Sequence, residues 1–95
     1  MNKALEYYNH GNYEESEKIY LKLLIFEEDN SDFYYNLGFS QFMSGKYDEA
    51  INSLATSLEL GLCNFDVCNL LAQCLEKTGD FDNAELYYSK ANELN

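Results

Sequence analysis

The sequence contains no proline in its 95 residues. Proline interrupts helices because its ring removes a backbone hydrogen bond and clashes with the preceding turn. The strict alternation of apolar and polar residues that marks half-buried strands is missing as well. These two absences predict an all-α fold.

Arginine is also absent: all six basic residues are lysines, 17 residues are acidic, and the net charge is −11. Nucleic-acid binding requires a basic patch that neutralises phosphates. Recognition of phosphopeptides and anionic lipids relies on arginine forks or polybasic clusters. We therefore expect a protein or peptide partner of basic, neutral or hydrophobic character, whose encounter the acidic field would accelerate. Most individual acids are expected simply to solvate the outer faces of helices.

Long apolar runs are missing too. The longest, Ile19 to Phe26, is interrupted by Lys22 and is too short to cross a bilayer. The first residues lack the apolar stretch of a secretory signal. The sequence therefore predicts a cytoplasmic protein without membrane contact.

Residues and motifs typical of catalysis are scarce. The single histidine, His10, precedes Gly11, where a cation suits the negative end of a helix. No phosphate-binding glycine loop, nucleophile elbow or metal-ligand pattern occurs. The acidic run at residues 27–29 fits a solvated turn better than a cation site. We expect no enzymatic activity, no cofactor and no metal.

The three cysteines, Cys63, Cys68 and Cys74, match no zinc or redox motif in their spacing. Cys68 and Cys74 fall at packing positions of a helix, where thiols act as small hydrophobic groups. Cys63 falls in a turn and is the candidate for reactivity. Reduced thiols are consistent with the cytoplasm.

The sequence does contain a regular repeat. Gly11, Gly45 and Gly79 are spaced 34 residues apart, and each is followed by an aromatic residue two positions on and a small residue five positions on. Glycine commonly ends a helix in the left-handed conformation. Acidic residues after each glycine favour the positive end of the next helix dipole. The pattern predicts a stack of similar units, with helices near 2–10, 12–27, 32–44, 47–60, 65–78 and 81–94.

With this period and helix–turn–helix unit, the chain resembles the tetratricopeptide repeat family. The middle unit matches best, at Tyr34, Leu37, Gly38, Gly45, Tyr47, Ala50, Leu54 and Leu58. Cys68 and Leu23 depart from the usual large aromatic and small residue at their positions. The resemblance implies a single domain over 1–95, a solenoid of three repeats (1–30, 31–64 and 65–95) wound into a right-handed superhelix. The first repeat would be truncated.

In this family the first helix of each repeat lines a concave groove that holds a peptide or an extended protein segment. The resemblance places there Leu5, Tyr8, Tyr35, Asn36, Phe39, Phe42, Met43, Asn69, Leu70 and Gln73. Aromatic and amide side chains suit a peptide with hydrophobic anchors. Asn36 stands where family members often hold the peptide backbone. For Phe42, groove and core remain open alternatives. The implied function is a protein-interaction module: an adaptor, a scaffold or a chaperone-like protein.

Some family members clamp the acidic C-terminus of a chaperone with basic groove residues. The corresponding positions here hold Met1, Leu5, Asn36, Asp66 and Leu70, of which only Asn36 agrees. An acidic groove would repel a carboxylate terminus, so this partner is disfavoured.

Two alternative functions stay open. The segments FYYNLGFSQFMSGKYDEAI and LLAQCLEKTGDFDNAE resemble the chaperones of type III secretion translocators, which hold a hydrophobic client segment. The other alternative is self-assembly. The first helix is cut short at Met1 and nothing follows Asn95, so we expect Leu86 and Tyr87 to be exposed at an uncapped end. This predicts a homodimer or a piece of a larger protein.

Overall fold

The computed structural model describes residues 12–94 as five α-helices connected by short turns. The helices are α2 (Tyr13–Phe26), α3 (Ser31–Met43), α4 (Tyr47–Glu59), α5 (Phe65–Lys77) and α6 (Phe81–Leu94). The described residues include no strand. Every helix end lies within one residue of its predicted position, which confirms the all-α prediction. The helix predicted over 2–10 lies outside the described residues.

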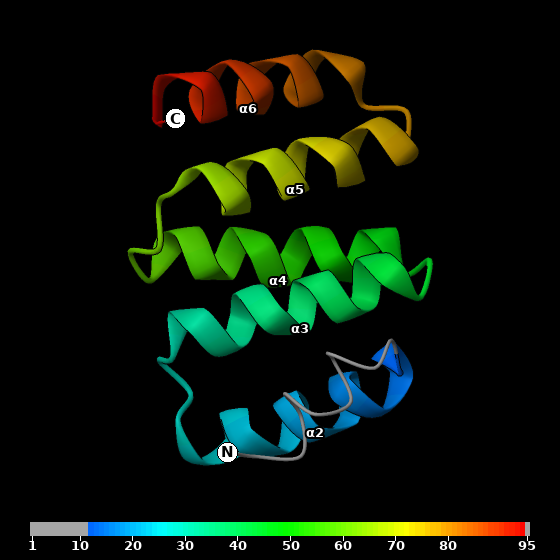
Figure 1. The fold of residues 1–95 in the computed structure, drawn as a ribbon, viewed down its shortest axis with the longest axis vertical. Helices are drawn as coiled ribbons and strands as arrows, with labels where there is room; N and C mark the ends of the chain where they lie inside the picture. Colours follow the sequence, from blue (N-terminus) through cyan, green and yellow to red (C-terminus); the bar gives the residue numbers. More distant parts are fainter. Residues whose placement is uncertain (1–11, 95) are drawn as a thin grey trace.

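The helices are stacked in chain order, and each runs antiparallel to the one before it (Figure 1). Each helix contacts the next, and α3 also contacts α5. Such nearest-neighbour packing is typical of a solenoid. Because the direction alternates, α3 and α5 run the same way, and their first turns lie at the same side of the stack.

Asparagine and glycine set the helix boundaries. Asn30 and Asn64 cap α3 and α5: their Oδ1 atoms accept hydrogen bonds from the backbone N–H groups of Phe33 (3.0 Å) and Val67 (2.9 Å). Gly45 and Gly79 adopt φ values of +81° and +88°, in the left-handed region that favours glycine. The role predicted for these two glycines is confirmed, and Gly11 lies outside the described residues.

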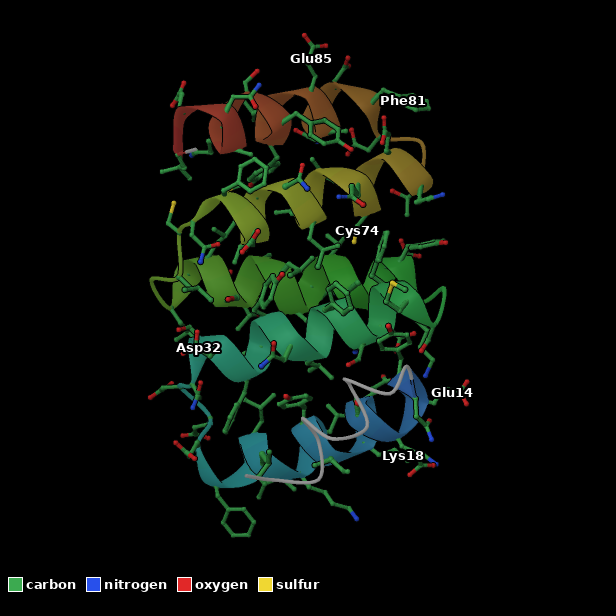
Figure 2. All side chains as sticks on the ribbon, in the orientation of Figure 1. Glu14, Lys18, Asp32, Cys74, Phe81 and Glu85 are labelled. Atoms are coloured by element: carbon green, nitrogen blue, oxygen red, sulfur yellow. The ribbon has the colours of Figure 1, made fainter. Side chains whose placement is uncertain are left out.

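The buried side chains form two clusters along the stack. The main cluster joins α4, α5 and α6 through Ala50, Leu54, Val67, Leu70, Leu71, Cys74, Leu75 and Ala84. A smaller cluster joins α2 and α3 through Tyr20, Leu24 and Leu37. Cys68 and Cys74 are fully buried, as predicted, and Cys63 is exposed. In Figure 2, Cys74 lies between α5 and α4.

The two helices of the middle repeat, α3 and α4, approach each other closely at Gly38. A Cβ atom on this glycine would lie 2.8 Å from Cγ of Leu54 and 3.4 Å from the carbonyl oxygen of Ala50. Leu54 is fully buried, so its side chain has no room to move aside. Gly38 therefore allows α3 to pack closely on α4.

We expect Gly38→Ala to lower the free energy of unfolding by about 1 kcal/mol. Overpacking costs about 1–3 kcal/mol, and alanine's better helix preference offsets about 1 kcal/mol of that loss. Urea unfolding followed by circular dichroism measures the change. Asn52→Ala, at an exposed position of α4, is the control and should be neutral or slightly stabilising. A Gly38→Ala protein as stable as this control would contradict the packing constraint.

Burial raises the pKa of the Cys74 thiol from 9.0 to about 12. The unfolded chain therefore loses this proton at lower pH than the folded protein does. The stability contributed by the neutral thiol is fully present below pH 9 and is lost as pH rises towards 12. The loss is on the order of 3–4 kcal/mol, from about 1.4 kcal/mol per pKa unit.

Cys74→Ala should therefore flatten the decline in the free energy of unfolding between pH 9 and 12, although the smaller side chain weakens the core at pH 7. Chemical unfolding at a series of pH values measures both effects. The control is Ser89→Ala, at an exposed position of α6. Its free energy of unfolding should decline with pH as steeply as that of the wild type. Equal slopes in all three proteins would contradict the assignment to Cys74.

Candidate peptide-binding groove

The predicted groove residues that the structure describes all lie on α3 and α5. Tyr35, Phe39 and Phe42 are each partly buried and pack against the main core cluster. Phe39 also meets the ring of Tyr13, with centroids 6.0 Å apart. These aromatic residues are therefore seated on the core with part of their surface still accessible. Leu5 and Tyr8 lie outside the described residues.

The position of Phe42 bears on the alternatives left open by the sequence. Its ring packs edge-on against Tyr47 of α4, with centroids 5.6 Å apart at an interplanar angle of 61°. It also touches the main core cluster and stays half-buried. Phe42 thus has a packing role, and its remaining accessible surface is free for a groove contact.

Asn36 is half-buried where α3 meets α2. Burial raises the pKa of the Tyr20 phenol, and a side-chain hydrogen bond with Asn36 opposes that rise. The Asn36 amide therefore lies close to the Tyr20 hydroxyl of α2. An amide has two donor hydrogens and an acceptor oxygen, so it has hydrogen-bonding capacity left for a bound backbone.

The other predicted residues differ in exposure. Met43, the last residue of α3, is 46% exposed. Asn69 and Gln73 are half-buried and one turn apart on α5. Leu70 is only 5% exposed and belongs to the main core cluster. Within the predicted set, Leu70 therefore supports the packing of α5 and offers little surface to a partner.

Acidic residues stand at one end of this surface. Asp32 and Asp66 occupy the first turns of α3 and α5, and both are exposed. Carboxylates at this position are favourable because they face the positive end of the helix dipole. Figure 2 shows Asp32 at the start of α3. Because α3 and α5 run the same way, the two carboxylates place negative charge on the same side of the stack.

A buried carboxylate fixes α2 against the middle repeat. Glu17 of α2 is only 6% exposed, and its Oε1 accepts a hydrogen bond from Nζ of Lys46 at 2.8 Å. Its Oε2 accepts one from Nε2 of Gln41 at 3.3 Å, and Oε1 of Gln41 accepts one from Oγ of Ser53 at 2.6 Å. This chain connects α2, α3, the following turn and α4. It therefore sets the angle at which α2 flanks the surface of α3.

Sequence reasoning missed two clefts between α4 and α6. One, of about 230 Å³, is lined by Ile51, Ala55, Leu71, Leu75, Asn83 and Tyr87. The other, of about 320 Å³, is lined by Leu58, Glu59, Cys63, Tyr87 and Lys90. Neither contains a predicted groove residue. Helical spacing could not find them, because they form where side chains of two helices that are not neighbours in sequence face one another.

Several large apolar side chains are exposed. On α2, Ile25 is 74% exposed and Phe26 is 86% exposed, beside a hollow of about 470 Å³ formed with the acidic turn at residues 27–30. The signal in the sequence was the apolar run from Ile19 to Phe26, which is longer than one helix face can bury. On α6, Leu86 is 58% exposed, as predicted, whereas Tyr87 is half-buried against the core.

Across residues 12–94, no helix has the length and apolar character needed to cross a membrane. Within the same range, no group of three or more histidine, cysteine or acidic side chains is arranged to hold a metal ion.

Sequence models described as tetratricopeptide repeat match the chain at residues 19–52, and at residues 1–29 and 65–95. The second of these models alone matches more than half of the chain. No curated protein sequence matches significantly.

Several solved structures are similar to the chain over nearly its whole length. MamA MSR-1 is 27% identical with a TM-score of 0.89, covering 96% of this chain and 52% of that chain. The Yersinia enterocolitica type III secretion translocator chaperone SycD is 28% identical with a TM-score of 0.91, covering 96% of this chain and 63% of that one. SycD in complex with a peptide of the translocator YopD is 28% identical with a TM-score of 0.89, covering 96% and 70%. The chain thus spans between half and about two thirds of the length of these proteins.

We expect Glu17→Ala to lower the free energy of unfolding by about 1–3 kcal/mol, because it leaves the buried Nε2 group of Gln41 without its acceptor. Glu15→Ala is the matched control on the same helix. Glu15 pairs with Lys18 at 3.4 Å on the surface, and such pairs contribute about 0–1 kcal/mol. Urea unfolding of both variants measures the difference. Equal losses would show that the buried network does not hold α2 in place.

Proposed function

The chain belongs to the tetratricopeptide repeat family, and we propose that it binds an extended segment of a partner protein across α3 and α5. The observation that supports this most directly is the set of partly accessible aromatic and amide side chains on these two helices, which contact each other and run in the same direction. The members of the set are Tyr35, Asn36, Phe39, Phe42, Asn69 and Gln73, together with the apolar Met43 at the end of α3.

The aromatic residues suit this role because they are already immobilised. Tyr35 and Phe39 rest on the main core cluster, so a partner would lose little side-chain entropy on contacting them. Asn36, Asn69 and Gln73 supply both donors and acceptors, which an extended backbone needs for its own N–H and C=O groups. Rigid apolar contacts combined with amide hydrogen bonds favour a peptide over a compact small ligand.

We propose that the bound segment has apolar anchors and a basic or neutral flank. The exposed carboxylates of Asp32 and Asp66 lie on the same side of the stack, and the whole chain carries a net charge of −11. A basic flank would be attracted to these groups, whereas an acidic one would be repelled. We further propose a cytoplasmic, non-catalytic protein; its three cysteines are free thiols, as is usual in a reducing compartment.

A second, narrower function is that of a chaperone for a secreted translocator. It is supported by the similarity to SycD, a chaperone whose structure has been solved with a translocator peptide. Under this function the bound segment would be strongly hydrophobic and would come from a translocator. Self-assembly through α6 is the third possibility; it is supported by the exposure of Phe81 (65%) and Leu86 (58%). Light scattering across a concentration series tests it, and a strict monomer would exclude it.

The groove is tested with peptides selected from a displayed library of short random sequences. We expect Asn36→Ala and Met43→Ala each to weaken binding of the selected peptide. The Kd should rise about tenfold, as it does when a good interface contact is lost. Fluorescence anisotropy of the labelled peptide measures the Kd. Circular dichroism should show unchanged helicity, because neither residue belongs to a buried cluster.

The matched controls are Asn52→Ala and Leu86→Ala, an amide and an apolar residue exposed on α4 and α6. They should bind the peptide as the wild type does. Asn83→Ala reports on the cleft of about 230 Å³ between α4 and α6. If Asn83→Ala weakens binding and Asn36→Ala does not, the α3–α5 assignment is wrong. If the library yields no peptide, the peptide-binding proposal itself fails.

A further inference from the structure

Cys63 and Cys68 stand on either side of the N-terminus of α5. Asn64 is the N-cap residue, and its Oδ1 accepts a hydrogen bond from the N–H of Val67 at 2.9 Å. The helix begins at Phe65, and the N–H of Cys68 donates to the carbonyl oxygen of Asn64 at 3.2 Å. Cys63 is therefore the residue before the cap and Cys68 the fourth residue of the helix. Side chains at these two positions commonly contact each other in capped helices.

The two thiol groups are near neighbours in this structure. The pKa of Cys68 is raised first by burial and then by the charge of Cys63 and a side-chain hydrogen bond with it, while Lys90 of α6 lowers it. Such an effect acts only between neighbouring groups, as expected for side chains at these two helix positions. They differ sharply in access, since Cys68 is fully buried and Cys63 is exposed.

A cleft gives small solutes a route to Cys63. It has a volume of about 320 Å³, and Cys63 lines it together with Leu58, Glu59, Tyr87 and Lys90. The other buried thiol, Cys74, belongs to the main core cluster. The other asparagine-capped helix, α3, has Asp29 and Tyr34 at the equivalent positions. The paired thiols are therefore specific to the start of α5.

We propose that Cys63 and Cys68 form a reversible redox pair that hydrogen peroxide converts to an intramolecular disulfide. The thiolate of Cys63 attacks one peroxide oxygen; an S–O bond forms, the O–O bond breaks, and the departing hydroxide leaves as water after taking up a proton. Cys68 then attacks the sulfur of the resulting sulfenic acid. The S–S bond forms, the S–O bond breaks, and the proton of Cys68 leaves with the hydroxyl as a second water. Two thiols are oxidised and one peroxide is reduced.

The pair lies between the second helix of the middle repeat and the first helix of the last, so oxidation would fasten the α4–α5 turn to the body of α5. A dithiol reductant reverses the reaction by thiol–disulfide exchange. Because Cys63 is the accessible member, it reacts first, and Cys68 serves as the resolving thiol. This inference does not depend on the peptide-binding proposal.

The test treats the full chain with equimolar hydrogen peroxide. We expect the wild type to fall from three titratable thiols to one, with the loss of two hydrogen atoms from the monomer mass. Peptide mapping should find Cys63 joined to Cys68, and dithiothreitol should restore all three thiols. An unchanged thiol count, a link to Cys74, or a disulfide between two chains in the wild type would each overturn the proposal.

Two variants separate the steps. Cys68→Ala keeps the exposed thiol, so Cys63 should accumulate as a sulfenic acid that dimedone labels. In the wild type this labelling should be much weaker, because Cys68 resolves the sulfenic acid. Cys63→Ser should lose no thiol under the same treatment, and its exposed position keeps the fold intact. Equal dimedone labelling of the wild type and Cys68→Ala would show that Cys68 does not act as the resolving thiol.

Discussion

The close approach of α3 and α4 at Gly38 is the constraint on which the rest of the structure depends. Leu54 is fully buried against the bare backbone of Gly38, and a single added Cβ would collide with it. In the next repeat Ala72 takes the corresponding position and is also fully buried. Small residues at this spacing let successive helices pack closely enough to bury a continuous core. Close stacking matters because none of the units can bury its apolar face alone.

Stacking decides which side chains reach the surface. It turns α3 and α5 the same way and leaves Tyr35, Phe39 and Phe42 supported by the core but still partly accessible. It also opens two clefts between α4 and α6, on surfaces that the helical register alone does not mark. A protein of this kind can therefore offer two different surfaces, one of aromatic and amide side chains and one with an apolar floor.

Polar groups help to fix the positions of helices and side chains where few apolar residues are buried. Between α2 and α3 the core cluster consists of Tyr20, Leu24 and Leu37, and the buried carboxylate of Glu17 adds hydrogen bonds to Gln41 and Lys46. At the start of α5, Asn64 accepts a hydrogen bond from the N–H of Val67 and so fixes the helix start that places Cys63 near Cys68. In both places a side-chain hydrogen bond fixes a geometry with consequences for neighbouring side chains.

The sequence by itself determined the described helices to within one residue, since their ends follow from local chemistry: asparagine caps, left-handed glycines and first-turn acids. It also determined the burial of Cys68 and Cys74, because helical periodicity marks a packing face. Only the tertiary structure decided that Leu70 belongs to the core, that Asn36 bonds with Tyr20, and that Glu17 reaches Lys46. The physical reason is that each of these contacts joins different helices. Their partners depend on the angles and separations of packed helices, which no local pattern specifies.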